Sequence, residues 1–275
     1  MNRKDLDPDE SPLAAFGSHL RRLRDERGWT QEELADRIGC SATHISAIET
    51  GRRMPTLRFA SSADRAFGTG EQFQRRARAA RNTPWLEGFP EFVAHEGKAS
   101  EIRLFELGIV PGLLQTPEYA AAITTGAVRR GMITEQQAHD RTALVAQRQA
   151  ALQRSPAPLI YAVLDESCLR RVVGGPEVMA GQLDRIATFA ELPNTIFQVA
   201  PYDLGERRAF DLPVTLLTLP DRTHLCYAES AHQGSLERES RYVLPLLTAY
   251  HQLQAEALSQ AASVAMIEQL RKGTP

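Results

Sequence analysis

The sequence predicts an all-α domain of five short helices followed by a mixed α/β (α+β) domain with a closing C-terminal helix. Three observations lead to this prediction. Cap residues and helical spacing alternate closely up to about residue 82, whereas short β-branched or apolar runs bounded by Pro, Asp and Asn appear only after residue 157. Apolar residues then recur at helical spacing from Ser240 to about Lys272. A chain of 275 residues is long enough for two such domains.

The first domain is expected over residues 12–82, after a disordered arm of residues 1–11 that mixes both charges and lacks an apolar period. Its clearest local signals are Thr30 and Glu33, which have the spacing of a capping box, and Gly39, where the chain can leave a helix with a positive φ. Ser41 can cap the next helix. Two short helices joined by a tight turn constitute a helix-turn-helix.

The second helix of this pair has an apolar side at Ile45 and Ile48, so that small or polar side chains face outward. Such side chains can approach base edges in a major groove. We expect base contacts from Gln31, Ala42, Thr43, His44 and Ser46, and phosphate contacts from Ser41, Thr50, Arg52, Arg53 and Arg58. A helical hairpin that only packs would leave this small outward face, followed directly by arginines, unexplained.

The same stretch resembles phage-repressor-like regulators of the Xre type. The matching residues are the Gln, the small residue, the turn Gly, two apolar packing residues and a closing E-x-G: Gln31, Ala35, Gly39, Ile45, Ile48, Glu49 and Gly51. The resemblance implies that the helix opening with Gln31 lies against the DNA backbone and that the next helix enters the groove. Ala42 departs from this pattern, because a Gln that can pair with adenine often stands there, and the target sequence is therefore left open.

The second domain, residues 83–275, is expected to contain both helices and strands. Helices are predicted over residues 134–154 and 176–190. Strands are predicted in PLIYAVLD, TIFQVAP, PVTLLTLP and THLCYAE, and the last two should form a hairpin around Asp221 and Arg222. The long apolar stripe of the closing helix indicates either core packing or a dimer seam, and packing is favoured because its heptads are not strict.

Three motifs follow one another in the second domain: IVPGLLQTPEYA, DESCLRRVVGG and LPNTIFQVAP. This ordered set is similar to the effector domain of unknown function in WhiJ-like regulators of actinobacteria. The resemblance implies a transcriptional regulator of development or secondary metabolism, with a small partner protein encoded nearby. Two alternatives remain: a small-molecule-responsive repressor, and an antitoxin-like protein that neutralises a neighbouring small protein and binds DNA for autoregulation.

Four polar residues in or near the first of these motifs, Arg103, Glu106, Gln115 and Tyr119, form a candidate pocket for a ligand or a partner. They could equally tie the PGLLQT turn to a sheet by hydrogen bonds, which is the interpretation that we favour.

Catalytic and metal sites were weighed as alternatives. Asp165 and Glu166, beside Arg170 and Arg171, are expected to cap a helix rather than catalyse a reaction. The spacing of His224, Cys226, Glu229 and His232 matches no standard metal site, so we expect neither a metal nor a cofactor.

Charge and cysteine content bound the remaining possibilities. The net charge of −2 hides an uneven distribution, because residues 1–82 carry 15 Lys and Arg against 12 Asp and Glu, while the rest carries 17 against 22. Three dispersed cysteines indicate free thiols in a reducing cytosol, and we expect a cytoplasmic protein without a membrane segment.

Because one recognition helix reads only a few base pairs, we expect a homodimer on a palindromic operator.

Overall fold

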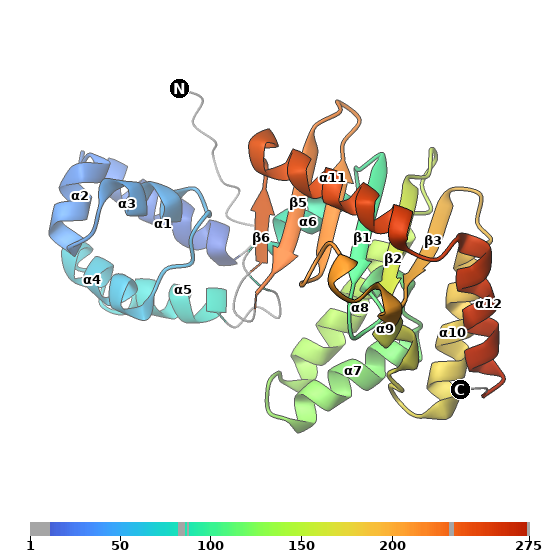
Figure 1. Ribbon diagram of the computed structural model, residues 1–275. Coiled ribbons are helices and arrows are strands. Elements are labelled where there is room, and N and C mark those ends of the chain that lie inside the picture. The colour runs from blue at the N-terminus through green and yellow to red at the C-terminus, as the bar shows by residue number, and fades with distance from the viewer. Residues whose placement is uncertain (1–11, 82–85, 87, 231–233, 274–275) are drawn as a thin grey trace. The chain divides into compact units, whose positions relative to one another are not determined.

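The computed structural model describes residues 12–81, 86, 88–230 and 234–273 (Figure 1). The chain forms two compact units, Met1–Thr83 and Pro84–Pro275. The predicted arm of residues 1–11 and the junction at residues 82–84 lie outside the described residues. In the described part of the chain, no helix combines the length and the apolar character needed to cross a membrane.

The first unit is helical, as predicted. Its helices are α1 (Pro12–Glu26), α2 (Gln31–Ile38), α3 (Ala42–Glu49), α4 (Leu57–Phe67) and α5 (Gln72–Arg81). The side chain of Thr30 accepts from the Glu33 amide while the Glu33 carboxylate accepts from the Thr30 amide, which confirms the predicted capping box. Gly39 ends α2 with a φ of 80°, a conformation that a side chain would penalise. Local signals therefore set the limits of the helix-turn-helix.

An apolar core holds these helices together. Its largest fully buried side chains are Phe16, Leu20, Leu34, Ile45, Ile48 and Phe73. Asp64 in α4 adds a polar link, because its carboxylate accepts from the amides of Phe73 and Gln74 at 2.9 and 3.1 Å. These bonds satisfy donors at the start of α5, which intrahelical bonds cannot do.

The second unit contains a mixed sheet with the strand order β3-β2-β1-β4-β5-β6. The strands are β1 (Glu101–Glu106), β2 (Leu159–Asp165), β3 (Thr195–Ala200), β4 (Val214–Thr218), β5 (His224–Glu229) and β6 (Gly234–Glu237). The pairs β1–β2 and β2–β3 are parallel, whereas β1–β4, β4–β5 and β5–β6 are antiparallel. The predicted strands correspond to β2, β3, β4 and β5, including the hairpin, while β1 and β6 were not predicted.

Helices cover both faces of this sheet (Figure 1). The elements besides the strands are α6 (Phe89–Glu96), η1 (Gly112–Leu114), α7 (Pro117–Arg129), α8 (Glu135–Ala151), α9 (Glu166–Arg170), α10 (Pro176–Ala190), η2 (Tyr202–Arg207), α11 (Ser240–Glu256) and α12 (Gln260–Arg271). Alternate strand residues enter two separate apolar clusters. Leu104 and Ala162 pack with α7, α10 and α12, whereas Phe105 and Val163 pack with α11.

The prediction of one closing helix from Ser240 to about Lys272 is wrong. The chain leaves the helix at residues 257–259, where the Leu258 amide donates to the Val199 carbonyl of strand β3 at 2.9 Å and Ser259 caps α12. The chain thereby passes from one face of the sheet to the other. Tyr250 is buried on the first face and Ile267 on the second, so the apolar stripe divides between two cores.

Candidate nucleic-acid interface

Helix α3 is held at its start by a cap and along its length by apolar packing. The Ser41 hydroxyl accepts from the His44 amide at 3.2 Å. Ile45 and Ile48 are fully buried in the core of the first unit. The rotation of α3 about its own axis is therefore fixed, and Ser46 and Ala47, between these two residues, are only half-buried.

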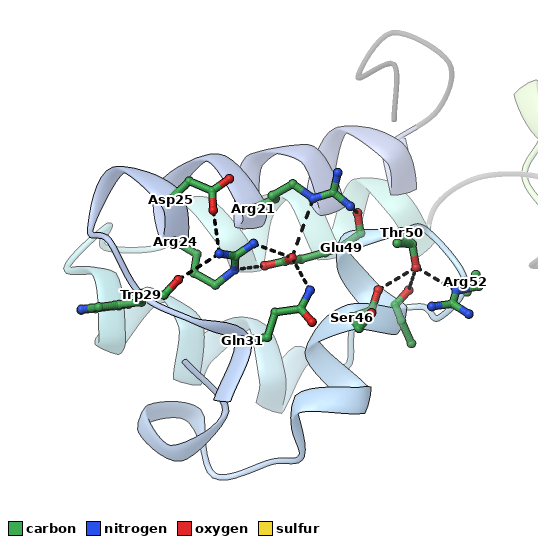
Figure 2. A network of polar contacts seen from close by, with 10 residues as sticks. Arg21, Arg24, Asp25, Trp29, Gln31, Ser46, Glu49, Thr50 and Arg52 are labelled. Carbon is green, nitrogen blue, oxygen red and sulfur yellow. Dashed lines mark hydrogen bonds and ion pairs between the residues drawn. The ribbon is translucent and has the colours of Figure 1, made fainter. Parts of the chain in front are cut away.

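A buried carboxylate fixes the other end of α3 (Figure 2). Glu49 is completely buried, and it accepts from Arg24 Nε at 2.5 Å and from Arg24 Nη2 at 2.9 Å. Gln31 Nε2 donates to the same carboxylate at 2.9 Å, and Arg21 Nε lies 3.8 Å from it. Because these partners belong to α1 and α2, one side chain joins three helices.

The guanidinium of Arg24 is itself fully engaged. Its Nη1 atom donates to Asp25 Oδ1 at 2.6 Å and to the Trp29 carbonyl at 2.9 Å. Hydrogen bonding to Glu49 raises the pKa of Arg24 above its already high value. The sequence placed Glu49 in a family motif but gave neither residue this positioning role. The available signal was an acidic residue on the apolar side of α3 and an arginine on α1.

The predicted base-reading residues differ in exposure. Thr43 is exposed, whereas Gln31, Ala42, His44 and Ser46 are half-buried. The ring of His44 stacks on Phe59, with centroids 5.5 Å apart and planes within 2°. Burial lowers the pKa of His44, and the charge of Arg53 lowers it further. Ala42 also packs against the core. The expectation of a fully outward face is therefore wrong for His44 and Ala42, because their side chains contribute to packing.

The predicted phosphate-contacting residues surround the ends of α3 and the start of α4. Ser41, Arg52, Arg53 and Arg58 are exposed. Thr50 is half-buried: its hydroxyl donates to the Ser46 carbonyl at 2.6 Å and accepts from Arg52 Nε at 2.9 Å. Three exposed guanidinium groups thus follow directly after the recognition-type helix in the chain.

The structure does not bring the four predicted pocket residues together. Arg103 lies on the opposite face of β1 from Leu104 and Glu106, because neighbouring strand residues alternate. Its guanidinium pairs with Glu101 at 2.6 Å and lies 4.6 Å from the ring centroid of Tyr161. Its inclusion in the pocket is therefore wrong.

Gln115 and Tyr119 have the hydrogen-bonding role that was the favoured alternative. Gln115 Nε2 donates to the Val110 carbonyl at 2.7 Å, and the fully buried Tyr119 hydroxyl accepts from the Val110 amide at 3.1 Å. Both bonds hold the turn that follows β1. Glu106 and Gln115 also line a cavity of about 530 Å³ within the second unit.

The residues considered for catalysis or metal binding are engaged in local structure. Asp165 caps α9 by accepting from the Ser167 amide at 3.0 Å, and Glu166 pairs with Arg170 at 2.5 Å, as the capping interpretation predicts. Among the described residues, no group of three or more His, Cys, Asp and Glu could hold a metal ion. His232 lies outside the described residues.

Three curated proteins illustrate what the chain is similar to. An uncharacterized HTH-type transcriptional regulator, y4dJ, from Sinorhizobium fredii is 51% identical over 41 residues, covering 15% of this chain and 53% of that protein. An uncharacterized HTH-type transcriptional regulator from Methanothermobacter thermautotrophicus is 47% identical over 49 residues, covering 18% and 71%. A Neisseria hypothetical transcription factor from Neisseria meningitidis is 44% identical over 46 residues, covering 16% and 43%. The chain spans about half the length of the first of these relatives.

No solved structure matches the chain. Two family models match it. The model described as a helix-turn-helix domain covers residues 15–78, which contain α2 and α3. The model described as a domain of unknown function (DUF5753) covers residues 89–269, more than half of the chain. The protein therefore belongs to the DUF5753 family and carries a helix-turn-helix domain in its first unit.

Proposed function

We propose that the protein is a sequence-specific DNA-binding transcriptional regulator. The observation that carries this proposal is the fixed position of α3: Glu49 joins it to α1 and α2 from inside, while Thr43 remains exposed on its other side. A helix held in this way can enter a major groove without losing its orientation. The regulator names of the similar proteins support the same function.

Base reading is assigned to the side of α3 that faces away from the core. Thr43 and Ser46 approach base edges directly, because a hydroxyl can donate to or accept from any base. Ala42 packs against the core and is not assigned a base contact. His44 sets the position of this surface through its stacking on Phe59. Gln31 donates one amide hydrogen to Glu49 and presents its amide oxygen toward the groove.

Affinity comes mainly from the exposed arginines. Arg52, Arg53 and Arg58 contact phosphates, and Ser41 and Thr50 add hydroxyl groups near the same backbone. Each phosphate that a cation neutralises adds about 0.9 to the steepness with which log K falls with log salt. Together, these three arginines account for a slope of about 2.7 in each bound copy.

A homodimer binds a palindromic operator in this proposal. One recognition helix reads only a few base pairs, so two copies on half-sites about 34 Å apart are required for useful specificity. Light scattering at micromolar concentration, with and without DNA, tests this part. A monomer under both conditions would contradict it.

The second unit supplies partner or signal sensing. The resemblance of its motifs to WhiJ-like regulators implies a role in the control of development or secondary metabolism in an actinobacterium, together with a small partner protein encoded nearby. Genome neighbourhood separates this role from an antitoxin-like one, because an antitoxin lies beside the gene for its toxin.

Genome-wide capture of DNA fragments by the purified full chain tests the central part of the proposal. The best fragment is then titrated at two salt concentrations. Tight binding to a palindromic site, with affinity that falls steeply as salt rises, is the expected result. Weak binding without sequence preference would contradict the assignment of specific DNA reading to the free protein.

A further inference from the structure

The second unit contains a cavity of about 530 Å³ at the carboxyl end of β1. The chain builds β2 and β3 on one side of β1 and then returns to place β4 on the other side. The strand order therefore reverses next to β1. In open α/β sheets, ligands characteristically bind outside the carboxyl ends of the strands at such a reversal. Topology alone thus points to a binding site here.

Most of the cavity wall is apolar. Phe89 of α6, Ile123 and Ala127 of α7, and Leu144 and Val145 of α8 contribute to it. A volume of several hundred cubic ångströms with apolar walls and a few polar groups is typical of sites for small organic molecules.

Three carboxyl groups are among the polar groups at this cavity. Glu106 lies at the end of β1 and Glu229 at the end of β5, and both line the cavity. Burial, followed by the charge of Glu229, raises the pKa of Glu106 to about 8. Within the described part of the chain, no other side chain donates a hydrogen bond to the Glu106 carboxyl group. Glu106 is thus a cavity-facing carboxyl group without a side-chain partner.

The neighbouring cation is already neutralised. Arg148 of α8 donates to Glu96 through Nε at 2.7 Å and through Nη2 at 2.8 Å. Arg141 also lines the cavity, so two guanidinium groups face three carboxyl groups. Once Glu106 ionises, carboxylates outnumber guanidinium groups by one among the described residues that line the cavity.

We propose that this cavity binds a small organic cation, with an apolar body against α6, α7 and α8 and an ammonium or amidinium group at Glu106. This inference does not depend on the proposed DNA-binding function. The Glu106 carboxyl group accepts from the backbone amide of Leu107, and a charge-assisted hydrogen bond from the ligand would add a cationic partner and offset the repulsion with Glu229. An anion would add to the excess negative charge, and a neutral alcohol would leave it unchanged.

Three matched probes test the proposal by calorimetric titration of the full chain: 4-phenylbutylamine, 4-phenylbutanol and 4-phenylbutyrate. The amine is expected to bind about tenfold more tightly than the alcohol, because a hydrogen bond between charged groups contributes more than one between neutral groups. The carboxylate should bind most weakly. Equal affinities for amine and alcohol, a preference for the carboxylate, or no binding of any probe would overturn the proposal.

Glu106→Gln keeps the shape of the carboxyl group and removes its charge. This variant should lower affinity for the amine about tenfold and leave affinity for the alcohol unchanged. Glu268→Gln is the matched control, because Glu268 is an exposed residue of α12 that does not line the cavity. Unchanged amine affinity in the Glu106 variant would overturn the placement of the cation.

The pH dependence of the unmodified chain gives an independent test. Among the described residues, the titratable groups that face Glu106 or line this cavity are Glu229, Glu96, Tyr227, Arg148, Arg141, Tyr119 and Cys168. Burial raises the pKa values of Tyr119, Tyr227 and Cys168, so these groups stay neutral. Amine affinity should rise about tenfold between about pH 6.5 and pH 9, as Glu106 ionises, while alcohol affinity stays constant. A flat amine profile would contradict the role of Glu106.

Discussion

The two units contain the same chemical arrangement, a buried arginine bound through two nitrogens to a buried glutamate, but they place it differently. In the first unit, Arg24 and Glu49 lie inside the helical core, with side-chain exposures of 6% and 0%. In the second unit, Arg148 and Glu96 lie beside a cavity, with side-chain exposures of 13% and 2%. The guanidinium of Arg148 also lies 5.3 Å from the ring centroid of Phe89.

The difference concerns what the arginine does with its remaining donors. Every nitrogen of Arg24 donates to the protein. Among the described residues, Arg148 uses Nε and Nη2 for Glu96, and its Nη1 has no hydrogen bond of its own. Burial opposes the charge of Arg148 most strongly, but hydrogen bonding to Glu96 and the charges of Glu96, Glu229 and Tyr227 together outweigh it and raise the pKa. The Arg24–Glu49 pair, whose nitrogens are all engaged, fixes helices. The Arg148–Glu96 pair lies at a cavity and leaves a hydrogen-bond donor for a ligand.

Removal of Glu49 should have the largest effect on stability. Glu49→Ala removes the buried carboxylate that Arg24 Nε and Nη2 bind and leaves Arg24 with Asp25 and the Trp29 carbonyl, which lowers the free energy of unfolding of the first unit by about 3–5 kcal/mol. Urea unfolding followed by Trp29 fluorescence in a Trp85→Phe background measures this value. Asp36→Ala, at an exposed position of α2, is the control and should change the value by less than about 0.5 kcal/mol. A loss below about 1 kcal/mol would contradict the anchoring role of Glu49.

Removal of Glu96, the corresponding residue of the second unit, should lower the free energy of unfolding by less. Glu96→Ala leaves Arg148 beside Glu229 and next to a cavity, so we expect a loss of about 1–3 kcal/mol in denaturant unfolding. Glu91→Ala, on the same helix, removes an exposed ion pair with Arg238 and should cost about 0–1 kcal/mol. If Glu96→Ala lowers the free energy of unfolding as much as Glu49→Ala does, the contrast between the Arg24–Glu49 pair in a core and the Arg148–Glu96 pair at a cavity is wrong.

Glu106 should make the stability of the second unit depend on pH. Its folded pKa of about 8 lies above the ordinary value of 4.5, so the folded state holds the proton more tightly than the unfolded state. The contribution of protonated Glu106 to the stability of the second unit is therefore fully present below about pH 4.5, and it is lost as the pH rises through about 8. Glu106→Gln should be more stable than the unmodified chain at about pH 9 by about 1–2 kcal/mol and nearly equal to it at about pH 5. Parallel thermal melts at both pH values measure this difference, and equal differences at the two would contradict the raised pKa.

The smallest expected effect comes from the capping boxes, which allow a comparison because each unit has one. Thr30 with Glu33 caps α2, and Thr134 with Gln137 caps α8. Thr30→Ala and Thr134→Ala should each lower the free energy of unfolding of their own unit by about 1 kcal/mol. Thr→Ser at the same positions retains the hydroxyl acceptor and serves as the control. A loss that appears in the other unit would show that the two units do not unfold separately.

Local signals predicted much of the fold. The caps at Thr30 and Ser41 and the turn at Gly39 are read from neighbouring residues, and strands β2 to β5 have apolar or β-branched runs. Strand β1 was missed because Glu101, Arg103 and Glu106 interrupt its apolar pattern. Without β1, the opposite orientations of Arg103 and Glu106 could not be inferred.

Other features depend on contacts between distant parts of the chain. The break between α11 and α12 was missed because the apolar period continues through it, and its cause is a hydrogen bond from Leu258 to Val199. The stacking of His44 on Phe59 likewise joins two helices. The link between Arg24 and Glu49 spans 25 positions of the sequence. The partner in each of these contacts lies far away in the sequence, so neighbouring residues do not identify it.

The most direct test of the central claim, that α3 reads DNA from a fixed position, is the affinity of Ser46→Glu for the best captured fragment. A carboxylate at this half-buried position would face the phosphate and base acceptors of the groove. We predict at least about 100-fold weaker binding with an unchanged circular dichroism spectrum, whereas Ser46→Ala should weaken binding by no more than about tenfold. Unaltered affinity of a normally folded Ser46→Glu variant would contradict the placement of α3 in the groove.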